Sequence, residues 1–416
     1  MDTVKKKALI AMSGGVDSSV AAAYMVQDGY ECIGCTMKLL GCLDEAGTFV
    51  RSVQADAGSA DPGEEGSGSV RSDFMPGRAH TCCSLEDVED ARSVAWKLGM
   101  LYYVFNFSPE FEEKVIDRFV RTYQMGGTPN PCIDCNRYLK FGKLFQRAQE
   151  LGCDVVVTGH YARTGYDETC GRWQLLRSKN PSKDQTYVLY AMTQEQLAHV
   201  RFPLGDAADK EQIRRTADRY GFVNSRKPDS QDICFVPDGR YADFIERRTG
   251  QRAPCGDFVD REGNVLGTHK GVIRYTIGQR RGLGLALPAP LYVNRIDTEK
   301  NQVILTPEED LYSSRLVAED FNWIWTADWG KWCGGAEDKG LMNPPAGYTC
   351  EVTAKPRYRA KEAAATARVL EGGKVEILFH EPQRALTSGQ AVVLYDGENV
   401  VGGGTICGMD DGQETS

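Results

Sequence analysis

The stretch ALIAMSGGVDSSVAAAYMVQDGY, residues 8–30, joins an apolar run to an alanine-rich segment through a glycine turn. The run ending at Met12 predicts a buried strand, and the segment after the turn predicts a helix closed by Gly29. Backbone N–H groups at a helix N-terminus favour a bound anion. The stretch therefore predicts a phosphate-binding loop, although it lacks the lysine of a Walker-type loop.

The residues of the turn itself, SGGVDSS at 13–19, suit a nucleotide. Glycines allow close approach of the backbone, serine hydroxyls donate hydrogen bonds, and the carboxylate of Asp17 suits a Mg²⁺ ion beside the phosphates. A glycine turn before a serine-capped helix is the simpler alternative, but the strand–turn–helix context favours ATP. The expected nucleotide contacts are Ala11, Met12, Ser13, Gly14, Gly15, Val16, Asp17 and Ser18.

Composition narrows the class of protein. The chain has 416 residues, of which 41% are hydrophobic, with 14 cysteines and a formal net charge of -9. We expect a cytoplasmic protein with reduced cysteines and no membrane partner, because neither a spanning apolar run nor a secretory leader is evident. The acidic balance argues against a generally cationic nucleic-acid binder, so any RNA must meet local basic patches.

The pattern along the chain predicts three parts. Strand-like runs alternate with helical segments up to about residue 161, which is typical of a doubly wound parallel α/β sheet; Ser84 and Asp87 begin one helix, and Gly99 closes it. We expect a nucleotide domain over 1–220, with a disordered acidic insertion at about 44–78. A small central domain over 221–287, a C-terminal β-barrel over 288–408 and a flexible tail over 409–416 follow. Runs such as LYVNRIDTEKNQVILTP and QAVVLYDGENVVGGGTI indicate the barrel strands.

Further motifs refine this interpretation. SGGVDS resembles the signature of the PP-loop ATP pyrophosphatases, which cleave ATP to AMP and pyrophosphate while adenylating a substrate. GGTPNPCIDCNRYLKFGKL, VVTGHYAR, KDQTYVLYAM, DSQDICFV, YTIGQRRGLG and KPRYR, in this order, resemble the tRNA-specific 2-thiouridylases. The resemblance implies ATP-dependent thiolation of a uridine, at the wobble position, with sulfur from a cysteine desulfurase, a relay protein or free sulfide. An amidating PP-loop synthetase acting on a small substrate, and a non-enzymatic RNA-binding module, are the alternatives.

Two cysteines have the setting of a sulfur-transfer site. Cys135 follows the turn TPNP and opens a helical run whose dipole is expected to lower its thiol pKa, and Cys234 lies in DSQDICF. By resemblance, Cys234 carries a persulfide, and Cys135 attacks it or releases sulfide from it. Many 2-thiouridylases have aspartate where this chain has Cys132. Cys132, Cys135 and Cys234 together fit a three-cysteine [4Fe-4S] cluster, or Cys132 is a spare or resolving thiol.

The resemblance also assigns substrate contacts. It places Gly159 and Met37 at the nucleotide and His160 near the tRNA, although a buried, hydrogen-bonded histidine is an equal alternative on residue type. The basic stretches HKGVIRYTIGQRRG, residues 269–282, and KPRYRAK, residues 355–361, suit phosphate contact and base stacking. The positions matching tRNA contacts are Lys183, Asp184, Gln185, Arg357, Tyr358 and Gln390, and those matching the pocket for the target base are Asn130, Pro131 and Cys132.

Overall fold

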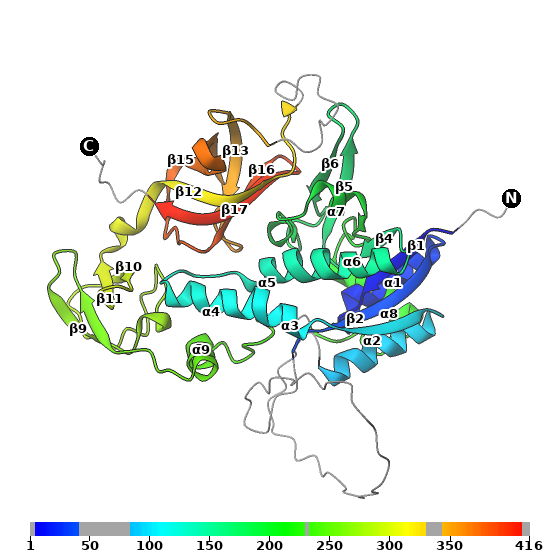
Figure 1. Ribbon diagram of the computed structural model, residues 1–416, viewed down its shortest axis with the longest axis horizontal. Coiled ribbons are helices and arrows are strands. Elements are labelled where there is room, and N and C mark those ends of the chain that lie inside the picture. Colours follow the sequence, from blue (N-terminus) through cyan, green and yellow to red (C-terminus); the bar gives the residue numbers. More distant parts are fainter. Residues whose placement is uncertain (1–4, 41–83, 229–232, 330–342, 410–416) are drawn as a thin grey trace, which may run out of the picture.

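The computed structural model describes residues 5–40, 84–228, 233–329 and 343–409. The insertion expected at about 44–78 lies outside these ranges, and so does the tail expected over 409–416, except for Met409, which ends the last strand. Figure 1 shows a parallel-sheet region, a small sheet and a barrel, with long helices running between them. This arrangement confirms the expected fold class, an N-terminal α/β sheet followed by a small middle part and a C-terminal β-barrel.

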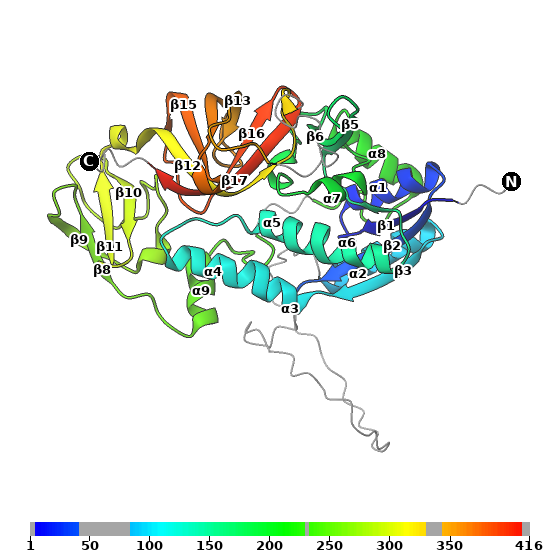
Figure 2. The ribbon, with the colours of Figure 1, turned by 45° about the horizontal axis from the view of Figure 1, so that its top comes forward.

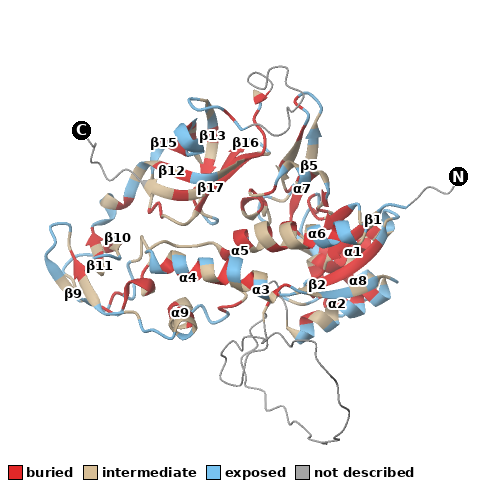
Figure 3. Cartoon of the chain, viewed as in Figure 1, coloured by how far each residue is buried: buried red, intermediate tan, exposed pale blue. Residues whose placement is uncertain are grey.

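The N-terminal sheet is parallel throughout, with its described strands in the order β3-β2-β1-β4-β7. Its central strand β1 is apolar because both of its faces are covered: Leu9 and Ile10 are fully buried. Figure 3 shows the same burial across β1 and β2. The strands are β1 (Lys7–Ala11), β2 (Glu31–Lys38), β3 (Leu101–Asn106), β4 (Val155–Val157) and β7 (Val200–Arg201).

The helices of this region begin and end at residues that the sequence marks. Ser84 and Asp87 form a reciprocal capping box at the start of α2, as predicted. Gly29 and Gly99 directly follow the C-cap residues of α1 and α2, in the left-handed conformation that favours glycine. These helices and the shorter ones nearby are α1 (Val16–Gln27), α2 (Leu85–Lys97), η3 (Thr186–Val188), α7 (Gln194–Ala198) and α8 (Lys210–Tyr220).

Two longer helical runs cross the middle of the molecule (Figure 1). Each contains a π-helical segment, a feature that occurs frequently at functional sites. The second run begins at Pro131 and carries Cys132 and Cys135. The segments are α3 (Ser108–Phe111), η1 (Glu112–Ile116) and α4 (Asp117–Gln124), then α5 (Pro131–Asp134), η2 (Cys135–Lys143) and α6 (Leu144–Glu150).

The small sheet has the strand order β10-β11-β8-β9. The run LYVNRIDTEKNQVILTP, expected in the barrel, forms β10 and β11, and β11 pairs in parallel with β8. This pairing buries apolar side chains. Val303 of β11 pairs with Phe258 of β8, and both belong to the hydrophobic cluster that contains Phe119 of α4. The elements are α9 (Tyr241–Thr249), β8 (Gly256–Val259), β9 (Val265–His269), η4 (Val272–Arg274), β10 (Tyr292–Asp297), β11 (Gln302–Thr306) and η5 (Glu308–Leu311).

The C-terminal barrel closes because β12 pairs with both β15 and β17. Figure 2 shows it lying over the long helical runs. A hairpin of the N-terminal region, β5 (Ala162–Asp167) and β6 (Arg172–Arg177), extends the same sheet through β17. Arg177 holds the hairpin there with a two-pronged ion pair to Glu362 at 2.7 Å. The barrel elements are β12 (Tyr312–Trp323), β13 (Thr349–Lys355), β14 (Ala363–Val369), η6 (Glu371–Gly373), β15 (Val375–Arg384), β16 (Ala391–Asp396) and β17 (Asn399–Met409).

None of the described helices combines the length and apolar character needed to cross a membrane.

Candidate active site

The SGGVDSS loop, residues 13–19, has the strand–turn–helix geometry predicted for it. β1 ends at Ala11, and Gly15 is the N-cap of α1. Gly14 has a φ of 72°, and a Cβ at this position would lie 2.4 Å from the carbonyl oxygen of Asp87. A side chain at residue 14 would therefore be strained and would also push α2 away from the loop.

Serine hydroxyls close the loop on itself. The backbone N–H of Ser13 donates to Ser18 Oγ at 3.2 Å. The hydroxyls of Ser18 and Ser19 both donate to the carbonyl oxygen of Gly15, at 3.0 and 3.1 Å. These bonds hold the first turn of α1 in a shape that an anion can approach, with the positive end of the helix dipole behind it.

Asp17 is held by two side chains that come from distant parts of the chain. The ammonium of Lys210, at the start of α8, lies 2.8 and 2.7 Å from Asp17 Oδ1 and Oδ2. The hydroxyl of Tyr161 donates to Oδ1 at 2.7 Å. Sequence reasoning missed both residues, because nothing near the loop signals them. The one available signal was that Tyr161 directly follows the TGH motif.

Asn224 is a third residue that contacts the loop and that was not expected from the sequence. It is buried, and its Nδ2 donates to the carbonyl oxygen of Gly14 at 2.8 Å and to Ser19 Oγ at 2.9 Å. Lys227, three residues on, binds Asp87 and Asp90 of α2 at 2.7 and 2.6 Å. The segment that leads toward Cys234 is therefore attached both to the loop and to α2.

Met37 and Gly159 lie at the same carboxyl edge of the sheet. Met37 is near the end of β2, next to Thr36, whose hydroxyl donates to the carbonyl oxygen of Met12 at 2.6 Å. A Cβ on Gly159 would lie 2.7 Å from the backbone nitrogen of Ser18. Residue 159 must therefore be glycine for the TGH turn to approach the loop so closely. The edge brings together several predicted nucleotide residues from three strands.

His160 is buried and hydrogen-bonded, which is one of the two alternatives expected for this residue. Its Nδ1 is 2.7 Å from Thr158 Oγ1, and its ring packs near Phe141 and Phe202. Burial, helped by the nearby charge of Lys140, lowers its pKa well below the usual value for histidine. The ring is therefore neutral at physiological pH.

The helix that carries Cys132 and Cys135 begins earlier than expected. Asn130 is its N-cap and Pro131 its first residue, so Cys132 lies in the first turn and Cys135 one turn further. The helix dipole acts mainly on the first turn, so it favours the thiolate of Cys132 more than that of Cys135. Cys135 therefore does not open the helix, contrary to expectation. The dipole effect on its thiol stays a prediction.

The surroundings of the cysteines also differ. Cys132 is exposed, whereas Cys135 and Cys234 are partly buried and pack against the same hydrophobic cluster. Asp134, between the two cysteines of the helix, is buried. Burial raises its pKa to about 6, although the guanidinium groups of Arg118 and Arg137 oppose the rise.

Several residues expected to contact tRNA gather near Cys132. Tyr358 is 42% exposed, and its ring centroid lies 5.6 Å from that of Tyr187. Burial raises the pKa of Tyr358, and the neighbouring Asp184 and Cys132 raise it further, while Lys183 opposes them. The structure therefore places the 183–185 turn and the β13–β14 connection beside the start of α5.

Other expected tRNA residues have structural partners. Gln185 accepts from the backbone N–H of Tyr161 at 2.9 Å. Gln390 Nε2 donates to the carbonyl oxygen of Thr128 at 2.9 Å, and Arg357 donates to that of Arg384 at 2.9 Å. The Gln390 bond attaches the barrel to the turn that precedes Asn130.

The basic stretch over residues 269–282 is less cationic than its sequence suggested. Arg274 is neutralised by Asp243 at 2.9 Å and by Glu246 at 2.8 Å, both on α9. Lys270, Arg280 and Arg281 are exposed. Acidic residues that are distant in sequence therefore remove one charge from the expected patch.

Comparison with known proteins identifies the family. Residues 6–60 and 70–238 match the model of a tRNA methyl transferase HUP domain, 242–307 that of a tRNA methyl transferase PRC-barrel domain, and 313–406 that of an aminomethyltransferase beta-barrel domain. A tRNA-specific 2-thiouridylase MnmA of Acetivibrio thermocellus is 47% identical over 402 residues, which cover 97% of this chain and 99% of the relative. The chain belongs to the tRNA-specific 2-thiouridylase family. The relative of the same name from Moorella thermoacetica is also 47% identical, over 96% of this chain and 98% of its own length.

Membership of the 2-thiouridylase family confirms the resemblance seen in the motifs and the expected enzyme class. The cluster expected from the sequence needs three cysteines close together, namely Cys132 and Cys135, three positions apart, and the distant Cys234. Cys132, Cys135 and Cys234 all lie in the described ranges, where no three or more His, Cys, Asp or Glu side chains are arranged to hold a metal ion. The three-cysteine cluster therefore stays a prediction from the sequence.

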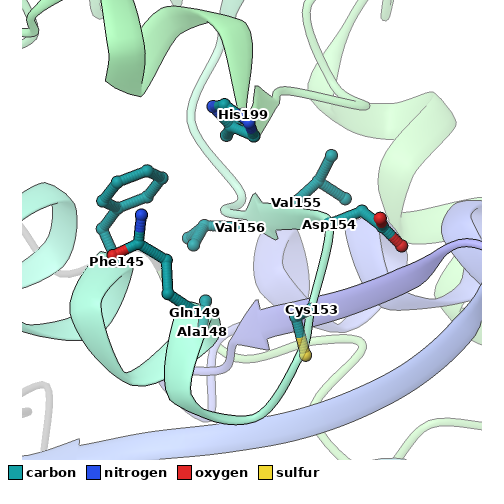
Figure 4. Close-up of a pocket in the computed structure, with 8 residues that line it drawn as sticks. All are labelled: Phe145, Ala148, Gln149, Cys153, Asp154, Val155, Val156 and His199. Atoms are coloured by element: carbon teal, nitrogen blue, oxygen red, sulfur yellow. The ribbon is translucent and has the colours of Figure 1, made fainter.

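The cavity shown in Figure 4 lies away from the SGGVDSS loop. It has a volume of about 230 Å³ and is lined by residues of α6, the start of β4 and His199. Because β1 and β4 are parallel, the amino end of β4 lies at the sheet edge opposite the SGGVDSS loop. Burial raises the pKa of Cys153 in its wall, so this thiol lacks the acidity of a nucleophile.

Proposed function

We propose that this protein is an ATP-dependent tRNA 2-thiouridylase that replaces the 2-oxygen of a uridine, at the wobble position, with sulfur. The observation that carries the proposal is the match to 2-thiouridylases over 97% of the chain, together with the SGGVDSS loop in its strand–turn–helix setting. A match over the full length includes the barrel and the cysteine segments, which an amidating synthetase does not need.

The nucleotide half of the reaction belongs to the SGGVDSS loop. We propose that the backbone of residues 13–16 and the hydroxyl of Ser18, which lie at the start of α1, bind the phosphates of ATP. The carboxylate oxygens of Asp17 are the ligand type that Mg²⁺ prefers, and the ion would neutralise phosphate charge when bound. Met37 and Gly159, at the same sheet edge, are proposed to contact the nucleoside. The uridine 2-oxygen attacks the α-phosphorus, pyrophosphate leaves, and C2 then carries AMP as its leaving group.

The sulfur half is proposed to use Cys135 and Cys234. The terminal sulfur of a persulfide on Cys234 attacks C2, and AMP departs with the original oxygen. The thiolate of Cys135 then attacks the sulfur of Cys234, which releases the 2-thiouridine and leaves a disulfide between the two cysteines. A thiol reductant must supply two electrons to restore the thiols. If Cys135 instead releases sulfide from the persulfide before C2 is attacked, the same disulfide results.

The tRNA is proposed to lie over the start of α5. Asn130, Pro131 and Cys132 would border the target base, and Lys183, Asp184 and Tyr358 lie beside them. The exposed ring of Tyr358 suits stacking on an unpaired base. Gln185, His160, Arg357 and Gln390 have protein partners, so their proposed contribution is to hold this surface in shape. In the cytoplasm, a cysteine desulfurase or a relay protein would supply the sulfur as a persulfide. Free sulfide would instead attack the activated C2 directly, with AMP as the leaving group and without a persulfide on Cys234.

A reconstitution experiment tests the proposal. The purified protein is incubated with unmodified tRNA, ATP, Mg²⁺ and either sulfide or a persulfide donor, and the nucleosides are analysed by mass spectrometry. We expect 2-thiouridine and AMP to form in equal amounts, and neither to form without ATP. An amidated product that depends on ammonia and does not require tRNA would support the synthetase instead.

A further inference from the structure

The ion pair between Lys210 and Asp17 brings a lysine to a phosphate loop that has none in its own sequence. The side chain of Lys210 is 14% exposed and that of Asp17 is 28% exposed, so the pair borders the loop without being sealed off. Both carboxylate oxygens face the ammonium, at 2.8 and 2.7 Å. The lysine therefore lies where cationic charge would meet the phosphates of a nucleotide.

The backbone beneath Lys210 is well anchored. Lys210 is the first residue of α8, and its neighbour Asp209 caps the helix by accepting from the backbone N–H of Gln212 at 2.7 Å. Gln212 in turn accepts from the backbone N–H of Ala208 at 3.0 Å. Farther along, Ile213 and Ala217 are fully buried against the core of the N-terminal domain. The position of the lysine Cα is thus fixed, while its long side chain can reach different nearby anions.

The charge of Lys210 is unfavourable for its own helix. A cation in the first turn opposes the helix dipole, which favours acidic residues there. Local helix stability therefore does not account for a lysine at this position. The structure places it against Asp17, which belongs to the loop proposed to bind phosphates.

We propose that Lys210 is the phosphate-binding lysine of this site, supplied by α8 instead of the loop. With the site empty, its ammonium neutralises Asp17. When ATP or pyrophosphate binds, the ammonium moves to phosphate oxygens, and Asp17 becomes available as an oxygen ligand for Mg²⁺. This inference rests on the proposed function, because it assumes that the loop binds a nucleotide.

Tyr161 allows this exchange without releasing Asp17. Its ring is buried, and its hydroxyl donates to Asp17 Oδ1 at 2.7 Å. The backbone of Tyr161 is fixed on both sides by Gln185, which accepts from its N–H at 2.9 Å and donates to its carbonyl oxygen at 3.0 Å. Asp17 therefore keeps one neutral donor when the ammonium leaves, and the carboxylate stays in place.

Binding of pyrophosphate and of ATP, measured by isothermal titration calorimetry with and without Mg²⁺, tests this inference. In EDTA, we expect Lys210→Met to weaken pyrophosphate binding about tenfold or more, because a charge-assisted hydrogen bond is lost. Lys210→Arg should keep most of the affinity. The matched control is Lys97→Met, which removes a lysine that binds the carbonyl oxygen of Gly221 at the other end of α8.

The variant Asp17→Asn separates this role from a merely structural ion pair. It frees the ammonium from its carboxylate, so pyrophosphate binding in EDTA should become stronger, whereas ATP binding with Mg²⁺ should become weaker. Because this variant retains Lys210, it also tests the inference if Lys210→Met does not fold. Unchanged or weaker pyrophosphate binding by Asp17→Asn in EDTA, or wild-type affinity in Lys210→Met, would overturn the assignment. If the wild-type protein bound neither ligand under either condition, the proposed nucleotide site itself would be wrong.

Discussion

Lys210 and Asp17 are 193 positions apart in the sequence, yet the lysine ammonium lies 2.8 and 2.7 Å from the two aspartate oxygens. A loop that looks incomplete in the sequence thus gains a cation from a helix much later in the chain. Asn224 and Tyr161 contact the same loop from two further segments. The proposed ATP site is assembled by tertiary contacts around a local motif.

The first prediction concerns Asp17. With Mg²⁺ present, Asp17→Asn should reduce AMP formation by at least a hundredfold, because the proposed metal ligand loses its charge. Affinity for tRNA should change by less than about twofold, since the proposed tRNA surface is formed by other residues. AMP release and filter binding of tRNA measure the two effects. Asp28→Asn, at the exposed C-cap of the same helix, is the control. Undiminished AMP formation in Asp17→Asn would refute the assignment.

The second prediction concerns Asn224. Asn224→Ala removes two buried hydrogen bonds to the loop, which should lower the free energy of unfolding by about 1–3 kcal/mol. The KM for ATP should rise, because the carbonyl of Gly14 and the hydroxyl of Ser19 lose their anchor. Urea unfolding and steady-state kinetics measure the two effects. The contact would be unimportant if neither the unfolding midpoint nor the KM moved.

The third prediction concerns pH and His160. Burial lowers the pKa of this histidine, so below about pH 6.5 the unfolded chain takes up a proton that the folded protein does not. The contribution of His160 to stability is therefore complete above that pH and is lost as the pH falls, by about 1.4 kcal/mol per pH unit. The free energy of unfolding should fall more steeply from pH 7 to pH 5.5 in the wild type than in His160→Gln. Parallel pH profiles would show that His160 has the same pKa in the folded and unfolded protein, against this prediction.

The fourth prediction concerns the reactivity of Cys132. This thiol is exposed in the first turn of a helix, whereas Cys255 is exposed outside any helix. The helix dipole should favour the Cys132 thiolate, so iodoacetamide should modify Cys132 several times faster than Cys255 at pH 7. Peptide mass spectrometry over a time course measures both rates in one sample. Equal rates would mean that the helix N-terminus has no effect on this thiol.

Local signals predicted the parts of the structure that depend on neighbouring residues. The strand before Ser13, the capping box of Ser84 and the glycine that closes each helix follow from turn and cap chemistry within a few positions. The start of the cysteine helix was predictable in the same way, because Asn130 followed by Pro131 is a typical helix N-terminus. The expectation that Cys135 opens this helix was therefore wrong.

Other features could not be read from local patterns. The hairpin of β10 and β11 has the alternation of any half-buried strand pair, and only contact with β8 decides which sheet it joins. Likewise, nothing near Arg274 shows that Asp243 and Glu246 neutralise it. Lys210 carries no motif around it. These features depend on the folding of distant segments against one another.

The central claim is that Cys135 and Cys234 transfer sulfur to a uridine that the SGGVDSS loop has activated with ATP. The most direct measurement is a single-turnover reaction of the protein with unmodified tRNA, ATP and a persulfide donor labelled with a sulfur isotope. Mass spectrometry then measures labelled 2-thiouridine. We predict that Cys135→Ser and Cys234→Ser each abolish the labelled product but still form AMP-activated tRNA, whereas Cys350→Ser in the barrel behaves as the wild type. Labelled 2-thiouridine formed at the wild-type rate by either Cys135→Ser or Cys234→Ser would contradict the account.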